Sequence, residues 1–144
     1  MVVCVDTSLL FSLYGNDVHS QRAITWVRSG KRPLTLSGFN EYELANALRF
    51  AEFRQVIAPG MAARCWSQFV ADQAAGRLVV AVPNLATVLT EARRLSATYT
   101  LTGGHRAFDI LHIATALQLG AGDFLTFEDN QKRLALAVGL HVPR

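Results

Sequence analysis

Cysteine is scarce in this sequence, and the two that occur are far apart. Cys4 and Cys65 are the cysteines of the 144 residues, and neither belongs to a CxxC or Cys/His pattern. A disulfide scaffold and a zinc site held by thiolates both need closely spaced cysteines or histidines, so the sequence argues against each. We interpret both residues as buried thiols of a protein in a reducing compartment.

Long hydrophobic runs and charged residues are also few. The longest uncharged stretches are much shorter than a membrane-spanning helix, and the segment before Asp6 has no basic leader. Charged residues make up 17% of the chain and hydrophobic residues 51%, which excludes a disordered polypeptide. We therefore expect a single cytoplasmic domain over residues 1–144, with no linker and no membrane segment.

Lysine contributes little to the positive charge, because 12 of the 14 basic residues are arginine. The formal net charge is +3 and the pI is about 9.2. Guanidinium groups pair bidentately with phosphate and carboxylate, so this excess suits a polyanion or an acidic protein surface as the partner. Many ordinary domains carry as much charge, so the charge alone identifies no partner.

Short apolar runs alternate with longer helical patterns along the chain. The apolar runs lack strict alternation, which is typical of a parallel sheet covered on both faces. We expect strands at residues 2–6, 34–36, 78–80, 123–126 and 140–142, and helices at residues 19–29, 40–53, 61–75, 85–97, 107–119 and 131–138. The segment 101–106, with its two glycines, is expected to be a flexible loop. Strands separated by helices favour an α/β sandwich with right-handed crossovers.

Asp6 is the first of four acidic residues with unusual surroundings, because it directly follows the apolar run at residues 2–5. Ligands of open α/β sheets bind beyond the carboxyl ends of the strands, where this carboxylate would lie. Alternatively, Asp6 caps a helix that begins at Thr7. A cap needs only one of Asp6, Thr7 and Ser8, so a functional role for Asp6 is the stronger interpretation.

Glu43 competes with Glu41 for the role of a second site acid. A rotation of about 100° per residue places Glu43 on the apolar sector of its helix, between Ala47 and Phe50, and Glu41 on a plausible solvent face. Alternatively, Glu43 completes a capping box with Asn40 as the cap. A carboxylate on the apolar sector is costly unless it is paired or binds a metal, which favours a functional Glu43.

Asp109 begins a helical stretch that is apolar on nearly every side. An unpaired, ionised carboxylate in a buried helix would be expelled or neutralised. Alternatively, Asp109 favours the helix dipole and pairs with Arg106. His112 lies on the same face, could hydrogen-bond Asp109, and is expected to support the site because the other candidate ligands are all oxygens.

Glu128 and Asp129 follow another apolar strand candidate. Thr126 and Asp129 imitate a capping box, which would leave Glu128 free to face the sheet edge. The choice between the two acids is open from the sequence. Together with Asp6, Glu43 and Asp109, one of them would complete a cluster whose mutual repulsion a Mg²⁺ or Mn²⁺ ion relieves, and such a site can hydrolyse a phosphodiester.

Several motifs resemble one known family over the whole chain. They are Asp6-Thr-Ser-Leu-Leu, Glu43-Leu-Ala-Asn-Ala-Leu-Arg, Arg106-Ala-Phe-Asp-Ile-Leu-His, and Thr126-Phe-Glu-Asp followed by Gly139-Leu-His-Val. Their order and spacing are similar to those of PIN-domain proteins, and most of all to the VapC-type toxins of bacterial toxin–antitoxin pairs. The resemblance implies a three-layer α/β/α sandwich with a short central parallel sheet. It also implies an endonucleolytic Mg²⁺- or Mn²⁺-dependent ribonuclease, often homodimeric, that a small antitoxin protein inhibits.

By the same resemblance, Asp6, Glu43 and Asp109 take the best-defined acidic positions, and Thr126 and Glu128 match a Thr-x-Asp motif. The sequence departs from that motif because Glu replaces the usual Asp, which leaves Asp129 as a rival. Ser8 and Asn46 resemble the polar residues that support the site. The candidates for contacts with substrate phosphates are Arg106, Arg49 and Arg22.

Three other functions compete with this one. An aspartate-nucleophile phosphatase would use Asp6, but this chemistry usually needs a second acid two residues later, where the chain has Ser8. A response-regulator receiver domain needs an adjacent pair of acids at a strand end, and the chain lacks that pair. A non-catalytic module that binds an antitoxin peptide or RNA could use the helical aromatic residues as a groove. A metal-dependent ribonuclease remains the leading hypothesis.

Overall fold

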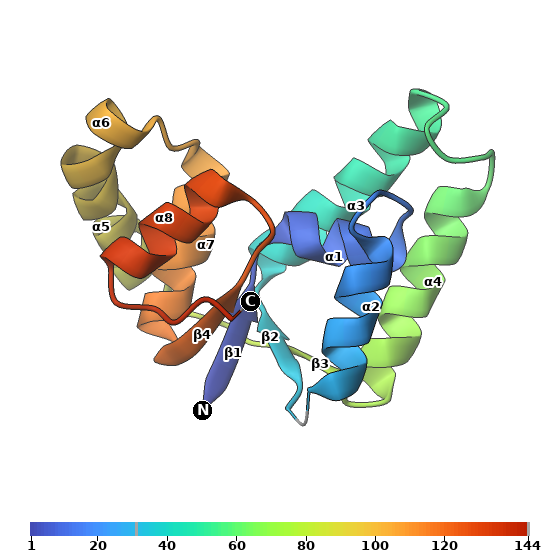
Figure 1. Cartoon of the computed structure of the whole chain (residues 1–144), viewed down its shortest axis with the longest axis horizontal. Helices are drawn as coiled ribbons and strands as arrows, with labels where there is room; N and C mark the ends of the chain where they lie inside the picture. The colour runs from blue at the N-terminus through green and yellow to red at the C-terminus, as the bar shows by residue number, and fades with distance from the viewer. Residues whose placement is uncertain (31, 144) are drawn as a thin grey trace.

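The computed structural model describes residues 1–30 and 32–143. Within these ranges, four strands form a parallel sheet in the order β3-β2-β1-β4 (Figure 1). The strands are β1 (Val2–Val5), β2 (Leu34–Leu36), β3 (Leu78–Val80) and β4 (Ala121–Leu125). The helices are α1 (Thr7–Tyr14), α2 (Ser20–Ser29), α3 (Gly38–Phe53), α4 (Met61–Ala74), α5 (Leu85–Leu95), α6 (Leu101–Gly103), α7 (Ala107–Gln118) and α8 (Asp129–Ala137), with a π-helical turn at Ser96–Thr100.

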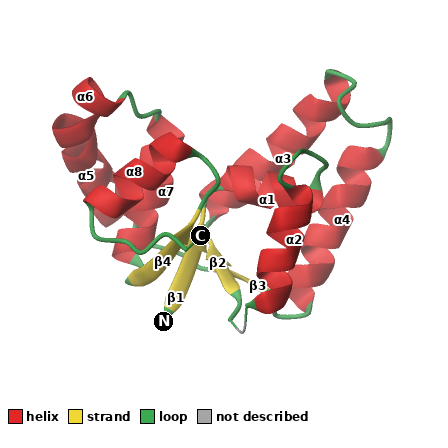
Figure 2. Cartoon of the chain, viewed as in Figure 1, coloured by secondary structure: helices red, strands yellow, loops and turns green. Residues whose placement is uncertain are grey.

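Helices cover both faces of the short sheet, as Figure 2 shows. Successive strand residues point to opposite faces. Cys4 of β1 accordingly packs in a core with residues of α5, α7 and α8, whereas Val5 packs in a second core with residues of α1, α3 and α4. Phe124 and Leu125 of β4 divide between the two cores in the same way. The fold is a three-layer α/β/α sandwich with a parallel sheet, which confirms the predicted fold class.

Strand β1 and its neighbour at the edge of the sheet, β4, end side by side. Val5 of β1 is in register with Leu125 of β4, and the backbone N–H of Asp6 donates to the carbonyl oxygen of Leu125 at 3.1 Å. Parallel strands bring their carboxyl ends to one edge of the sheet. The residues that follow β1 and β4 are therefore neighbours in space although they are remote in the chain.

Helix α3 begins two residues earlier than the sequence pattern predicted. Ser37 is its N-cap, and the amide oxygen of Asn40 accepts a hydrogen bond from the Ser37 backbone N–H at 3.1 Å, which makes the capping box. The alternative with Asn40 as cap and Glu43 as its partner is therefore wrong, and the Glu43 carboxylate is not needed for capping. Helix α1 follows β1 after Asp6. The sequence analysis had included this helix only in the alternative interpretation of Asp6 as a helix cap.

Two other local predictions are wrong. Residues 140–142 form an isolated bridge between His141 and Asp123 in place of a strand, because the following Pro143 has no N–H with which to extend the ladder. The predicted loop at 101–106 contains the short helix α6, which ends where Gly104 adopts a left-handed backbone with φ of 66°.

The remaining global expectations concern cysteines and membranes. Cys4 and Cys65 are both buried and free, as expected, and burial raises the pKa of the Cys4 thiol to about 12. None of the helices in the described ranges is long and apolar enough to cross a lipid bilayer.

Candidate active site

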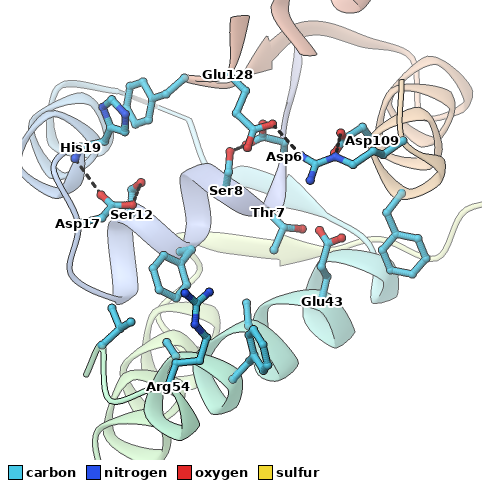
Figure 3. A pocket seen from close by; sticks show the side chains of 18 residues that line it. Asp6, Thr7, Ser8, Ser12, Asp17, His19, Glu43, Arg54, Asp109 and Glu128 are labelled. Atoms are coloured by element: carbon cyan, nitrogen blue, oxygen red, sulfur yellow. Dashed lines mark hydrogen bonds and ion pairs between the residues drawn. The ribbon is translucent and has the colours of Figure 1, made fainter. Parts of the chain in front are cut away.

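A cleft of about 630 Å³ lies at the edge of the sheet where β1 and β4 end. Its walls include four carboxylates from four separate parts of the chain: Asp6 after β1, Glu43 of α3, Asp109 of α7 and Glu128 after β4. Figure 3 shows these side chains facing a common space. The tertiary structure thus brings together the four acids that the sequence analysis selected.

Asp6 is at once a helix cap and a wall of the cleft. One carboxylate oxygen, Oδ1, accepts hydrogen bonds from the Leu9 backbone N–H at 2.9 Å and the Ser8 hydroxyl at 2.8 Å, and Oδ2 accepts one from the Thr126 hydroxyl. The side chain is 2% exposed. Burial raises the pKa of Asp6, although these hydrogen bonds oppose the shift. The two interpretations of Asp6 therefore do not exclude each other.

Glu43 is held by a buried histidine of another helix. The Nε2 atom of His112 lies 2.9 Å from Oε1 of Glu43 and 3.1 Å from the hydroxyl oxygen of Thr7. Asn40 donates its side-chain N–H to the same Thr7 oxygen at 3.2 Å. Burial raises the pKa of Glu43, but hydrogen bonds from His112 and Thr7 and the charges of His112 and Arg106 outweigh it, so the net pKa is lowered.

The structure corrects the predicted partner of His112. The sequence allowed a bond with Asp109 because both residues lie on one face of α7, whereas the imidazole reaches across to Glu43 on α3. The supporting role that was predicted for His112 fits this position, since its side chain is 1% exposed. Glu41, the rejected alternative to Glu43, is not among the residues that line the cleft.

Asp109 and Glu128 share one arginine. The Arg106 guanidinium lies 3.3 Å from the Asp109 carboxylate and 3.8 Å from that of Glu128, and its own side chain is 79% exposed. Gln131 of α8 donates a hydrogen bond to the backbone carbonyl of Asp109 at 3.0 Å, which ties the first turn of α7 to α8. Asp109 therefore pairs with Arg106, as the alternative interpretation of this residue predicted, and its side chain also lines the cleft.

The geometry distinguishes the two candidates for the fourth acid. Glu128 lines the cleft, whereas Asp129 is the exposed first residue of α8 and lines a smaller neighbouring hollow. The N-cap of α8 is Glu128, so the capping box that was predicted from Thr126 to Asp129 does not form. The Thr126 hydroxyl oxygen instead accepts a hydrogen bond from the Glu128 backbone N–H at 3.0 Å.

The pKa of Glu128 reflects the charges of the groups around it. Burial raises its pKa, repulsion from Asp6, Asp109 and Glu43 raises it further, and Arg106 opposes both. The four acids therefore interact, although in the described ranges no three acidic, histidine or cysteine side chains are close enough to make a preformed metal site. Hard oxygen donors that repel one another suit a divalent cation, so the residues present fit Mg²⁺ or Mn²⁺.

The polar residues predicted to support the site divide into two groups. Ser8 and Thr126 contact Asp6, whereas Asn46 is exposed on α3 and does not line the cleft. Among the arginines, Arg106 reaches the acids, but Arg49 lines a separate hollow between α3 and α4. Arg22 lies beside the cleft, where its guanidinium is over the Phe127 ring.

Sequence reasoning missed several residues that line the cleft or lie behind its wall. Thr7 and Asn40 had been considered only as helix caps, and their bonds to one another and to His112 depend on the packing of α1, α3 and α7. His19 and Phe127 line the cleft as well and had received no functional interpretation. The position of Phe127 between Thr126 and Glu128 was the one signal that could have drawn attention to it.

Comparison with known protein families matches residues 3–136 to the PIN domain. The chain therefore belongs to the PIN-domain family, as the motifs had predicted. A comparison with curated proteins finds no similar sequence.

Several solved structures share the fold. VapC20 of Mycobacterium tuberculosis, a toxin that cleaves the sarcin-ricin loop, has a TM-score of 0.71 and 15% identity, with 96% of each chain covered. VapBC-1 of nontypeable Haemophilus influenzae has a TM-score of 0.68 and 16% identity over 99% of this chain and 97% of the other. FitAcB of Neisseria gonorrhoeae has a TM-score of 0.67 and 17% identity, again over 99% and 97%. At these identities the similarity establishes the fold.

Proposed function

We propose that the protein is a divalent-metal-dependent endoribonuclease and the toxin of a toxin–antitoxin pair. One observation carries the proposal: four carboxylates from β1, α3, α7 and the exit of β4 line one cleft at the carboxyl end of the sheet. Membership of the PIN-domain family and the similarity to VapC20 support the nuclease assignment.

The acids would hold the cation, and each has a group of the chain that positions it. Thr126 and Ser8 orient Asp6, His112 orients Glu43, and Arg106 neutralises part of the charge of Asp109 and Glu128. When bound, Mg²⁺ or Mn²⁺ supplies Lewis-acid activation of water and of the phosphate. The exposed Arg106 can exchange its carboxylate partners for a phosphate oxygen of RNA and so bind the substrate at the acids.

A protein partner is the second part of the proposal. One wall of the cleft carries the apolar side chains of Phe11, Ala47, Phe50 and Val56, with the Arg54 guanidinium over the Phe50 ring. An antitoxin segment with apolar side chains for this wall and basic side chains for the four acids would complement the cleft. Two of the similar structures are VapBC assemblies and another is FitAB bound to DNA, which supports an antitoxin partner. We also infer a homodimer and a cytoplasmic location. A non-catalytic binding module is not favoured, because it gives no reason for four acids to meet.

The test combines metal binding with RNA cleavage. Purified protein is incubated with RNA with and without Mg²⁺ or Mn²⁺, and Asp6→Asn and Asp109→Asn are compared with Glu41→Gln. Glu41 is the matched control because it lies on α3, two residues from Glu43, and outside the cleft lining. We expect metal-dependent cleavage that the first two substitutions reduce at least about 100-fold and Glu41→Gln leaves unchanged. Undiminished cleavage by either Asp variant, or no binding of millimolar Mn²⁺ in calorimetry, would refute the proposed site.

A further inference from the structure

Two stacked rings lie at one side of the acidic cleft. The imidazole of His19 and the phenyl ring of Phe127 have centroids 5.0 Å apart and planes 22° apart. Both side chains line the cleft that holds the four acids, and Figure 3 shows His19 beside Asp17 on its wall. Phe127 follows Thr126, which donates a hydrogen bond to Asp6, and precedes Glu128, so the backbone that carries its ring passes next to two of the acids.

The position of these rings differs from that of a core pair. In the core, Trp66 stacks on Phe69, which is fully buried at 0% exposure. His19 and Phe127 are each half-buried and keep part of their surface toward the cleft. His19 is the N-cap residue of α2 but makes no side-chain capping bond. The fold therefore presents two partly exposed rings where a ligand of the acids would lie.

Two basic side chains, Arg22 and Lys132, lie beside Phe127. The Arg22 guanidinium carbon is 5.0 Å from the centroid of the Phe127 ring, and Arg22 is exposed. Phe127, Arg22 and Lys132 also line a small hollow of about 100 Å³ next to the cleft. Asp129 lines the same hollow and offsets part of its charge. The hollow has room for a group of the size of a phosphate.

The geometry points to His19 and Phe127 as the stacking platform for one unpaired base of the RNA, with Arg22 and Lys132 contacting a phosphate that flanks it; this inference rests on the proposed function. The acids repel the RNA backbone, so a strand whose phosphate reaches them needs neutral contacts nearby. Stacking of a base on aromatic rings supplies such a contact and accepts any base, because every base has a π-face. The platform thus contributes affinity and little sequence preference.

The test measures RNA binding separately from cleavage. A labelled single-stranded RNA of about 10 nucleotides is titrated by fluorescence anisotropy with the Asp6→Asn protein, in which cleavage is expected to be strongly reduced. In that background, Phe127→Leu and His19→Ala are expected to weaken binding about tenfold, whereas Phe127→Trp retains the affinity. Phe53→Leu is the matched control, because Phe53 is an exposed ring stacked on Phe50 at 6.2 Å that does not line the cleft.

Two further measurements assign the contacts. An abasic nucleotide is moved along the RNA, and at one position it should weaken binding by the protein with Phe127 but have no effect on Phe127→Leu. Lys132→Ala should reduce the slope of log K against log salt by about 1, as expected for one lost phosphate contact. Circular dichroism checks that each variant is folded. If Phe127→Leu is not, His19→Ala, which removes no capping bond, decides the result.

The outcomes separate this inference from the proposed function. If the protein cleaves RNA and both ring variants bind it as tightly as the parent, the platform is refuted while the nuclease stands. If Phe53→Leu weakens binding as much as Phe127→Leu does, the effect is not local and the platform is again refuted. If the unsubstituted protein neither binds nor cleaves RNA, the proposed function fails, and the platform fails with it.

Discussion

The Nε2 atom of His112 lies 2.9 Å from Oε1 of Glu43, so a buried side chain of α7 orients an acid of α3. The same nitrogen lies 3.1 Å from the Thr7 hydroxyl oxygen, and Asn40 donates to that oxygen. One histidine therefore connects three helices at the floor of the cleft. Its contribution is to position the carboxylate, because it lies behind Glu43 and does not line the cleft itself.

Replacement of His112 by Gln should remove the contact between the imidazole and the Glu43 carboxylate. We expect the Glu43 pKa to rise toward its ordinary value, since its hydrogen bond and charge partner is lost. Stability should fall by about 1–3 kcal/mol, the range for a broken buried hydrogen bond to a charged group. Carboxyl NMR titration and urea denaturation measure the two effects. The Glu43 contribution is present above the unfolded pKa and is lost as the pH falls through the lower folded pKa, so the stability difference should shrink in acid.

His141→Gln is the control for that experiment. His141 lies 3.0 Å from Asp123, but its side chain is 71% exposed, and the pair is outside the cleft. We expect a change of less than about 0.5 kcal/mol, as for other exposed ion pairs. An unchanged Glu43 titration in His112→Gln would contradict the positioning role.

Asp6→Asn should stabilise the metal-free protein at neutral pH. Burial raises the folded pKa of Asp6, so its contribution to stability is full below the unfolded pKa of about 4 and is lost as the pH rises through the folded pKa. Asn removes that loss and can still cap α1. We expect Tm to rise by about 3 °C or more near pH 7 and the two proteins to converge in acid. A variant that is less stable than the parent at neutral pH would show that the hydrogen bonds outweigh burial.

Glu128 and Asp129 can be distinguished by metal titration. Because Glu128 lines the cleft and Asp129 does not, Glu128→Gln should weaken Mn²⁺ binding about tenfold, whereas Asp129→Asn should leave it nearly unchanged. Isothermal calorimetry of both variants measures the affinities, and the two substitutions remove the same charge. The opposite order would identify Asp129 as the fourth ligand.

Asn40→Ala should destabilise the fold more than Asn84→Ala does. Asn40 is 4% exposed and bonds Ser37, Thr7 and the carbonyl of Val5, whereas the side chain of Asn84, an exposed N-cap, accepts one bond from Thr87. We expect losses of about 3 and 1 kcal/mol respectively, measured by urea denaturation. Equal losses would mean that the hydrogen bonds of Asn40 other than its capping-box bond to Ser37 contribute nothing.

The fold class and three of the acids could be predicted because the patterns that carry them are local. Unbroken apolar strands separated by helical patterns indicate a covered parallel sheet, and helical rotation separates Glu43 from Glu41 without knowledge of the partner helix. The start of α3 and the bridge at His141 were mispredicted, because each depends on one capping or ladder bond that several neighbouring residues could make.

The sequence by itself determined which acids stand at strand exits and on apolar helix faces. Only the tertiary structure decided how they are held: the Glu43 and His112 pair, the hydrogen bond from Thr126 to Asp6, and the choice of Glu128 over Asp129 for the cleft. The first two contacts join residues 69 and 120 positions apart in the chain. A residue pattern records the face of a single helix or strand, whereas such contacts depend on the angles and distances at which separate elements pack against the sheet.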